Sequence, residues 1–455
     1  MKTSRNHGTS GRLPSLPQLM QRAACRLALG LACCLALPAA ATELVIATVD
    51  NGHMITMQGL TRHYEQSHPG IKLKWVTLSE GALRQQMAAD VSTGQGQFDV
   101  MTIGLLETPI WGKKGWLREI TPQASDDLQD LLPNIRAGLS VGGKLYASPF
   151  YGESSMTLVR SDLLAQAGIK LPDNPTWAQI RDAAARLNQP DKGIHGICLR
   201  GRAGWGENMS LVTTMVNAMG GQWFDMSWRP QLDTKPWHEA VSLYVDLLKR
   251  YGPPGSAANG YNENLTLFSE GKCAIWVDAT VAGAFVNNPA RSKVAGKVAF
   301  LQAPQASTAK GSRWLWAWAL AVPRSSTHAP QALDFVRWAT SREYIKLVAS
   351  QSGWGAVPSG TRLSTYATAE FMKANAYARM EYAAIASANP LDSTLPRSPY
   401  VGIQFAAIPE FQAIGTAVGQ QISSLLTDGG SVDDALARAQ ALSLRKMKDA
   451  GYLLR

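Results

Sequence analysis

Three tryptophans recur at every second position in the segment RWLWAWALAV, which spans residues 313–322. They are Trp314, Trp316 and Trp318. A period of two is that of a β-strand, in which alternate side chains share one face. A row of three indoles on one face either fills a core or forms a flat apolar platform for a ligand. The spacing alone leaves both interpretations open.

Four acidic residues occupy loops or the ends of strand-like runs, namely Glu80, Glu153, Glu207 and Asp278. A pair of such carboxyl groups would hydrolyse a glycoside if their separation in space were right, and sequence spacing does not fix that separation. A sugar-binding site would place carboxylates in the same positions, as hydrogen-bond acceptors for hydroxyl groups.

Motifs for metal and nucleotide chemistry are missing from the sequence. It has no HExxH, Walker loop or CxxC. His63 and His68 are five residues apart, which is the wrong spacing for two ligands on one helix face. The run Gly94-Gln95-Gly96 is too short to cradle a phosphate. We therefore expect no metal, no cofactor and no covalent chemistry.

The elements that position these residues can be read from hydrophobic periodicity. Strand-like and helical runs alternate at residues 43–49, 54–66, 71–78, 83–91 and 98–103. This β-α-β-α-β order predicts a parallel sheet with helices on both faces. Ligands of such sheets bind at the carboxyl ends of strands, where Asn51 and Glu80 lie.

The later sequence continues the α/β pattern and then changes. Helices are expected at residues 176–187 and 237–251, strands at 194–199 and 274–277, and mostly helix from Ala329 onward. Arg200 follows the first of these strands. With 455 residues, the chain is longer than a single core usually grows, so two lobes are expected.

Residues 1–41 have the pattern of a secretory signal. Five basic residues and no acid precede or flank the short apolar run LALGLACCLAL, and small residues then offer a cleavage site after Ala41. Removing this segment lowers Lys+Arg from 44 to 39 against 34 acids, so the net charge falls to about +5. This mild charge, with no basic run of five, argues against a nucleic-acid partner. The mature protein should be exported and soluble.

Two cysteines, Cys198 and Cys273, remain after the signal is removed. Both lie in strand-like runs. In an oxidising compartment they could form a disulfide, and two buried free thiols are the alternative, because sequence spacing does not establish the geometry of a bridge.

A long ordered series of segments resembles one family. It includes TVDNGHM, QFDVMTIG, PIWGKKGWL, PFYGESSM, GICLRG, GWGENM, YGPPG, NENL, IWVDAT, WLWAW and YVGIQFAAIPEFQ. Together, from about Thr42 to the C-terminus, they resemble the sorbitol/mannitol-binding proteins of bacterial ABC transporters, within the family 1 extracellular solute-binding proteins. One departure is Ala319, where members of the family often have Asn after WLWAW. If that Asn touches the solute, the preference among polyols should differ here.

The resemblance implies an α/β, two-lobed periplasmic-binding-protein fold of type II, with the solute held between lobes. The crossings would fall near residues 149–152, 278–280 and 322–324. Lobe one would comprise residues 42–148 and 279–322. Lobe two would comprise residues 149–278 and the mostly helical residues 323–455.

A polyol site needs charged or amide groups for hydroxyls and flat apolar surfaces for C–H faces. A hydrogen bond to an ionised group contributes roughly 1.5–3 kcal/mol, against about 1 for a neutral pair. On this basis the resemblance implies eleven ligand-binding residues: Asn51, Glu80, Tyr151, Glu153, Arg200, Trp205, Asn208, Asp278, Trp316, Trp318 and Trp354.

Several of these residues have structural alternatives. Asn51 could instead cap the next helix, Glu80 could face a helix dipole, and Trp354 could anchor a surface loop. Trp314 is expected to pack, as are Trp111 and Trp116. Glu207 is expected to be a solvated rim or helix cap, and Asp99 to be structural.

We therefore expect a monomeric periplasmic receptor without enzymatic activity. It would trap an acyclic polyol by lobe closure and deliver it to ABC permease subunits at the inner membrane. The rival hypotheses are a receptor for another mono- or oligosaccharide, a secreted glycoside hydrolase, and a surface adhesin or scaffold.

Overall fold

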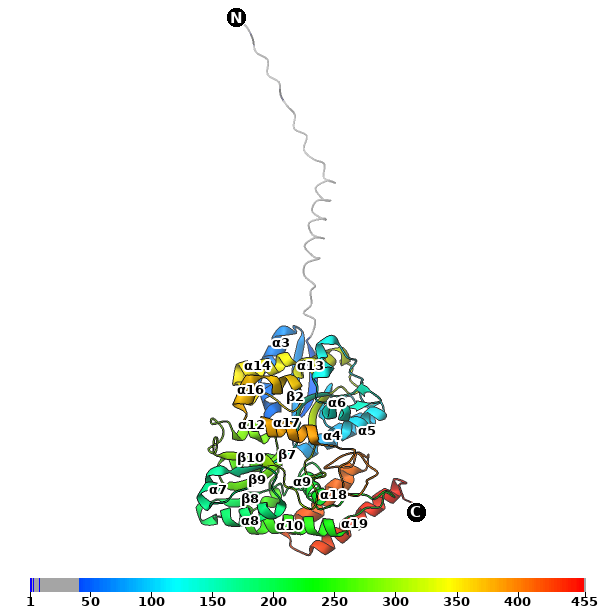
Figure 1. Cartoon of the computed structure of the whole chain (residues 1–455). Helices are drawn as coiled ribbons and strands as arrows, with labels where there is room; N and C mark the ends of the chain where they lie inside the picture. The colour runs from blue at the N-terminus through cyan, green and yellow to red at the C-terminus, as the bar shows by residue number, and fades with distance from the viewer. Residues whose placement is uncertain (2, 4–7, 9–40, 454–455) are drawn as a thin grey trace.

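The computed structural model describes residues 1, 3, 8 and 41–453. Nearly all of the predicted signal segment, residues 1–41, lies outside the described residues. The described chain forms two α/β lobes, one above the other in Figure 1, each built around its own β-sheet. No helix among residues 41–453 is long and apolar enough to cross a membrane.

The first lobe contains a five-stranded sheet in the order β2-β1-β3-β11-β6. The strands are β1 (Thr42–Val49), β2 (Ile71–Leu78), β3 (Val100–Ile103), β6 (Ser148–Glu153) and β11 (Trp316–Ala321). Strand β1 is parallel to β2 and β3, as predicted. Strand β11, which carries the tryptophan row, is antiparallel to both β3 and β6.

Helices cover this sheet, and the predicted helix at residues 54–66 is divided into two at Leu60. The helices are α2 (Gly52–Gly59), α3 (Thr61–Ser67), α4 (Glu80–Thr93), α5 (Glu107–Lys113) and α6 (Pro133–Gly138). A small hairpin of β4 (Ser140–Val141) and β5 (Lys144–Leu145) follows them.

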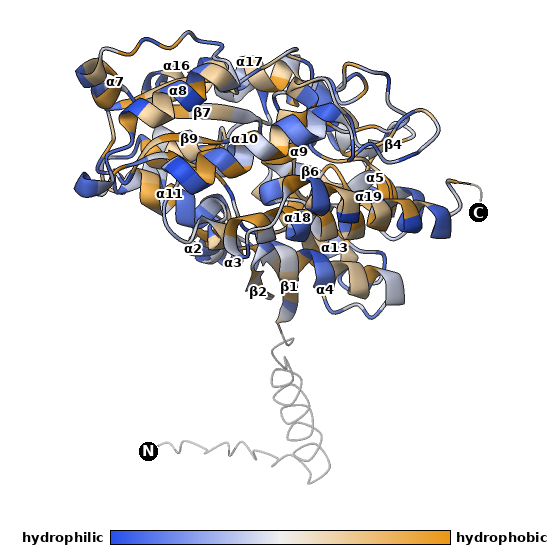
Figure 2. Cartoon of the chain, turned by 90° about the horizontal axis from the view of Figure 1, so that it is seen from below, coloured by the Kyte–Doolittle hydropathy of each residue, from blue (hydrophilic) through white to orange (hydrophobic). Residues whose placement is uncertain are grey.

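The second lobe contains a four-stranded sheet in the order β10-β7-β9-β8. The strands are β7 (Ser155–Arg160), β8 (His195–Cys198), β9 (Cys273–Ala279) and β10 (Val298–Gln302). The surrounding helices are α7 (Ser161–Ala167), α8 (Trp177–Leu187), α9 (Asn208–Ala218), α10 (Lys235–Tyr251), α11 (Tyr261–Ser269) and α12 (Ala282–Val286). Along α8 and α10 hydrophilic and hydrophobic residues alternate (Figure 2), as expected when one face packs on a core. Helix α9, in contrast, is buried at every residue.

The chain divides between the lobes differently from the predicted boundaries. Residues 279–322 were expected in lobe one, but β10 pairs with β7 in the second sheet and only β11 joins the first. The third crossing therefore lies between β10 and β11, before the tryptophan row rather than after it. Periodicity identified β11 but not β10, and it does not specify which sheet a strand joins.

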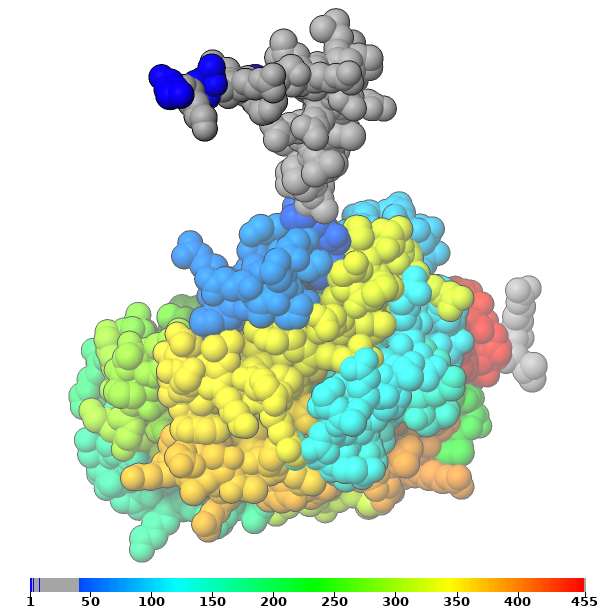
Figure 3. Space-filling model, turned by 90° about the horizontal axis from the view of Figure 1, so that it is seen from above, coloured from blue at the N-terminus to red at the C-terminus, as the bar shows by residue number. Residues whose placement is uncertain are grey.

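The C-terminal helices, expected together in lobe two, also separate. They are α13 (Ala329–Ala339), α14 (Arg342–Ser352), α15 (Leu363–Ala367), α16 (Ala369–Ala374), α17 (Ala378–Ser387), α18 (Phe411–Thr427) and α19 (Val432–Asp449). In α13, the Phe335 and Trp338 rings each lie 5.1 Å from the Tyr64 ring of α3. Figure 3 accordingly shows the yellow surface of this region directly against the blue surface of the first lobe. Helices α18 and α19 pack in the second lobe, against α9 and α10, whereas α17 contacts both β6 of the first sheet and β10 of the second.

Two crossings between the lobes hydrogen-bond to each other. The Thr280 backbone N–H, just after β9, donates to the Ser154 carbonyl over 2.8 Å. The Ser154 N–H, between β6 and β7, donates to Thr280 Oγ1 over 3.2 Å. These two segments lie close to the crossings predicted near residues 149–152 and 278–280, and they form the hinge region beside the cleft.

A disulfide joins Cys198 at the end of β8 to Cys273 at the start of β9, with Cα atoms 5.9 Å apart. Both residues are fully buried. The two strands are parallel neighbours, so the bridge crosslinks adjacent strands of the second lobe. Of the two alternatives left open by the sequence, the structure has the bridge rather than two free thiols.

Candidate functional site

A cleft of about 1040 Å³ lies between the two lobes. The first lobe contributes residues that follow β1, begin α4 and belong to β6 and β11, and the second lobe contributes the loop after β8 and the start of α11. The volume is at the upper end of the range of small-molecule sites, roughly 300–1,000 Å³. The cleft is the place where the carboxyl ends of strands from both sheets meet.

Eight of the eleven predicted ligand residues line this cleft. They are Asn51, Glu80, Tyr151, Glu153, Arg200, Trp205, Trp316 and Trp318. Glu207 was expected to be a solvated rim or helix cap. It is the N-cap residue of α9, also lines the cleft and is largely buried.

Three predicted residues do not line the cleft. Asn208 is fully buried, and its side chain bonds the Gly204 N–H and the Gly419 carbonyl over 3.1 and 2.9 Å. Trp354 packs with α14 and α16 on the first lobe. Asp278 is fully buried behind Arg200. Asn208 and Asp278 thus hold the cleft wall in place instead of facing its interior.

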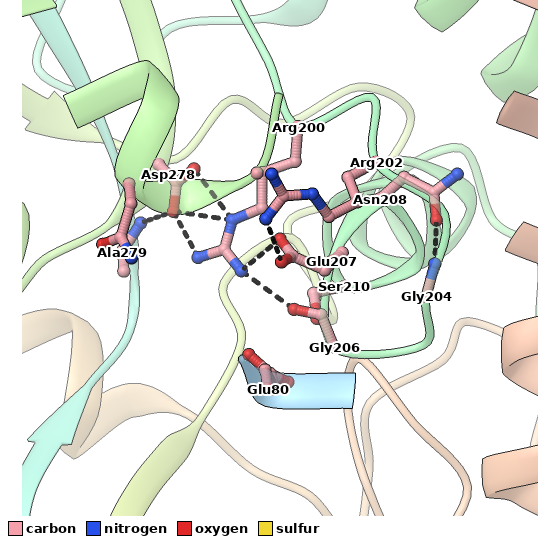
Figure 4. Close-up of polar contacts among 12 residues, drawn as sticks. Glu80, Arg200, Arg202, Gly204, Gly206, Glu207, Asn208, Ser210, Asp278 and Ala279 are labelled. Carbon is pink, nitrogen blue, oxygen red and sulfur yellow. Dashed lines mark hydrogen bonds and ion pairs between the residues drawn. The ribbon is translucent and has the colours of Figure 1, made fainter. Parts of the chain in front are cut away.

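Arg200 is held by ion pairs with Asp278 and, at 3.7 Å, with Glu207 (Figure 4). Its Nε donates to both Asp278 oxygens over 3.1 and 3.0 Å, and Nη2 donates to Oδ1 over 2.6 Å. Nη1 donates to the Gly206 carbonyl over 2.8 Å. The Trp276 indole and the Ala279 N–H also donate to the Asp278 carboxylate. These bonds meet the requirement that a buried acid have partners, and they fix the guanidinium in one position.

Trp316 and Trp318 form an aromatic wall around a second buried guanidinium, that of Arg84. Its Cζ lies 4.1 Å from the Trp205 ring centroid and 5.0 Å from those of Trp316 and Trp318. The Trp205 and Trp316 rings meet edge to face at 5.5 Å. Such cation–π contacts contribute about 0.5–2 kcal/mol each. Gly104 makes room for this wall, because a Cβ there would overlap the Trp316 indole.

Trp314 also reaches the cleft, although its side chain is buried as the packing prediction requires. The row is therefore both part of the buried core and part of the cleft lining. All three indoles line the cleft, and each is at most 5% exposed.

Sequence reasoning missed Arg84 and its second partner, Glu107. Arg84 donates from Nε and Nη2 to Glu80 Oε1 over 3.1 and 2.9 Å, and it also bonds Glu107. A signal was available, since Glu80 and Arg84 are four residues apart on one helix, the spacing at which such pairs meet. Glu107 carried no comparable signal, because it lies on a different helix.

Asn51 caps a helix, which is the structural alternative, and it also lines the cleft. Its Oδ1 accepts from the Met54 N–H over 3.1 Å and caps α2, while its Nδ2 donates to the Tyr151 hydroxyl over 2.9 Å. Ala319 is fully buried in β11 and is not part of the cleft lining. Asp99 is structural, as expected, and accepts from the Val45 N–H and the Ser326 hydroxyl.

Four buried polar atoms at the cleft surface have no hydrogen-bond partner among the described residues. They are Trp205 Nε1, Trp314 Nε1, Tyr261 Oη and Glu207 Oε2. Buried polar atoms are nearly always paired, because leaving one unpaired costs about 1–3 kcal/mol. Two indole donors, a phenol and a carboxylate oxygen aimed at one space are suited to a ligand with several hydroxyl groups.

Two carboxyl groups of the cleft have strongly altered acidity. Burial raises the pKa of Glu153 to about 8, partly offset by Arg200 and reinforced by the charges of Asp278, Glu80 and Glu381. Burial also raises the pKa of Glu207 to about 7, against the attraction of Arg200.

The lobes touch across the cleft at two kinds of contact. Asn262 Nδ2, in α11, donates to the Asp50 carbonyl after β1 over 2.9 Å. Arg84 of the first lobe stacks on Trp205 of the second. These contacts describe a closed arrangement of the lobes. In the part of the chain that the structure describes, no three His, Cys, Asp or Glu side chains are grouped to hold a metal ion.

Comparison with known proteins gives consistent results. A profile of the bacterial extracellular solute-binding protein family matches residues 50–346. The mannitol-binding protein of Pseudomonas aeruginosa is 53% identical over 425 residues, which cover 92% of this chain and 97% of that protein.

Two solved structures place the fold. An ABC transporter solute-binding protein from Agrobacterium vitis S4 with bound D-mannitol is 52% identical with a TM-score of 0.89, covering 90% of this chain and 99% of that one. A solute-binding protein from Agrobacterium radiobacter K84 in complex with ribitol is 21% identical with a TM-score of 0.79, covering 90% and 99%, and supports the fold alone. The predicted type II two-lobed fold is confirmed.

Proposed function

The chain belongs to the bacterial extracellular solute-binding proteins, and we propose that it captures an acyclic sugar alcohol such as mannitol or sorbitol. Capture occurs by closure of the two lobes, and the closed protein delivers its solute to the permease of an ABC importer. The protein is a binding protein and not an enzyme.

The observation that carries the proposal is the set of unpartnered polar atoms in an aromatic cleft. Trp205 Nε1, Trp314 Nε1, Tyr261 Oη and Glu207 Oε2 have no hydrogen-bond partner among the described residues, and all four residues line the cleft. Glu207 Oε2 is also 3.7 Å from Arg200 Nη1, as an ion pair. A flexible polyol carries both donor and acceptor capacity on every carbon and can satisfy each of these atoms. The relative of 53% identity that binds mannitol supports the same solute class.

We assign the ligand contacts as follows. Glu153, Glu207 and Arg200 engage hydroxyl groups, and the rings of Trp205 and Trp316 cover C–H faces. Asp278 acts through Arg200, which it orients, and Asn208 acts through the loop that carries Trp205. The influence of Ala319 on solute preference is then indirect, because it does not line the cleft.

Membership of this family also suggests a cellular location and partners for the protein. We propose that the protein works in the periplasm as a monomer after removal of residues 1–41. Its partners are the permease subunits of the importer, which receive the solute from the closed form. No nucleic acid and no cofactor take part.

A thermal-shift panel of the purified protein tests the solute class. Mannitol, sorbitol, arabitol and ribitol are compared with glucose, fructose and maltose. A ligand at 100 times its Kd stabilises by about 2.7 kcal/mol, which raises the midpoint by a few degrees. We expect shifts with the acyclic polyols only. A rise with a cyclic sugar or oligosaccharide and none with polyols would retain the fold and refute the solute.

Two tryptophan variants test whether the solute that causes the thermal shift binds in the cleft. Trp316→Ala removes a ring that lines the cleft, whereas Trp354→Ala removes one that does not. We expect the first variant to lose most of the mannitol-induced shift and the second to keep it. Equal shifts in both variants would place the solute elsewhere.

A further inference from the structure

Glu153 lies at the end of the cleft that is next to the hinge. It is the last residue of β6, directly opposite Trp316 in β11, and the crossing into β7 follows it. Its side chain lines the cleft, and the residue is 7% exposed. Among the described residues, none donates a hydrogen bond to its carboxyl group or forms an ion pair with it.

The two buried guanidiniums of the cleft are committed to other carboxylates. Arg200 donates to Asp278 through three bonds. Arg84 bonds both Glu80 and Glu107. Both cations are therefore held by other acids. Glu153 also lines the cleft, but no cation in the part of the chain that the structure describes is in contact with its carboxyl group.

Charged groups face Glu153 from every neighbouring element. Arg200, in the loop after β8, attracts its negative charge, whereas Asp278 on β9, Glu80 on α4 and Glu381 on α17 repel it. The nearby Tyr151 and Tyr261 hydroxyls are neutral at any physiological pH, because burial raises their pKa values well above the ordinary one. Burial is the main cause that disfavours the Glu153 carboxylate. Arg200 opposes this effect, and the charges of Asp278, Glu80 and Glu381 reinforce it.

We propose that Glu153 meets the solute as a neutral carboxylic acid, donating its O–H to one solute hydroxyl and accepting from another. This inference rests on the proposed function and adds a chemical identity to one of its contacts. Ionisation of Glu153 removes the donor, so the solute binds only to the protonated protein. Above the pKa of the free protein, each binding event takes up one proton.

Calorimetric titration with D-mannitol from about pH 6 to about pH 10 tests this linkage. We expect a Kd that rises about tenfold per pH unit above about pH 8, beyond the range in which Glu207 changes its charge. At the alkaline end, heats measured in two buffers of different ionisation enthalpy should reveal uptake of one proton.

Two substitutions distinguish a donor from an ionised acceptor. Glu153→Gln keeps an N–H donor and a C=O acceptor, whereas Glu153→Ala keeps neither. We expect Glu153→Gln to bind mannitol at least about tenfold more tightly than Glu153→Ala, and with a Kd that does not change at high pH. The neighbouring change Glu207→Gln should leave the alkaline rise in Kd in place. A flat wild-type profile, or Gln and Ala variants that are equally weak, would overturn the proposal.

A measurement without solute separates this inference from the proposed function. Carbon-13 spectra of glutamate-labelled protein, compared with Glu153→Gln, identify the Glu153 carboxyl signal. We expect that signal to titrate near pH 8 in the free protein. Titration near the ordinary value of about 4.3 would refute the neutral acid whatever the solute. If mannitol fails to bind at every pH, the proposed function fails, and the carbon-13 titration still decides the state of Glu153.

Discussion

Replacing Asp278 with Asn tests whether this residue acts by holding Arg200. The side chains of the pair are 8% and 0% exposed, with 2.6 Å between Arg200 Nη2 and Asp278 Oδ1. The amide keeps one acceptor oxygen but presents N–H groups to a guanidinium and to the Trp276 indole, which are both donors. The change thus leaves the buried cation with only the longer ion pair to Glu207, at 3.7 Å. Breaking a buried pair by removing one partner costs about 3–5 kcal/mol.

We therefore expect Asp278→Asn to lower the free energy of unfolding by about 3–5 kcal/mol, measured by urea denaturation followed by circular dichroism. Asp392→Asn is the matched control, because the Lys310–Asp392 pair is similar in length at 2.7 Å but lies at the surface. Exposed pairs contribute about 0–1 kcal/mol, so the control should change little.

A double variant separates stability from solute binding. Arg200→Met with Asp278→Leu removes both charges and replaces them with apolar side chains, which is often neutral for stability. We expect it to regain most of the lost stability while remaining weak in mannitol binding. If Asp278→Asn costs less than about 1 kcal/mol, or if the double variant binds mannitol like the wild type, our account of this pair is wrong.

Three further changes address other parts of the molecule. Gly104→Ala would force the Trp316 indole to move, so we expect a loss of about 1–3 kcal/mol in unfolding free energy and weaker mannitol binding by calorimetry. Reducing the Cys198–Cys273 disulfide, which spans 75 residues, should cost about 4.5 kcal/mol by loop entropy, seen as a lower urea midpoint under dithiothreitol; an unchanged midpoint would contradict this. Asn262→Ala removes a hydrogen bond between the lobes worth about 0.5–1.5 kcal/mol, so mannitol affinity should fall about two- to tenfold, and an unchanged affinity would exclude a role in closure.

The sequence predicted the cleft well where its residues follow strands. Asn51, Glu80 and Arg200 come directly after strands whose type and order could be read from periodicity, and the carboxyl ends of such strands converge. Tyr261 and Asn262 were missed because they begin a helix, and nothing in their local pattern indicates that the start of this helix faces the other lobe.

The division of the chain between lobes was harder to predict. Amphipathic patterns identify α13 as a helix with one apolar face, but they do not say which sheet that face covers. The contact that decides it, Tyr64 with Phe335 and Trp338, joins residues about 270 positions apart. Asp278 illustrates a related limit, since a residue at a strand end can stand behind a ligand-binding side chain as readily as beside it.

Arg84 stacks between tryptophans of both lobes, and this arrangement provides an optical signal for movement of the lobes. Trp205 belongs to one lobe and Trp316 to the other, and their rings are 5.5 Å apart in the closed arrangement. Separation of the lobes would pull these chromophores apart and expose both to water. The intrinsic ultraviolet emission and near-ultraviolet dichroism of the unlabelled protein therefore report opening and closing directly. Transport can then be followed in time with no dye attached.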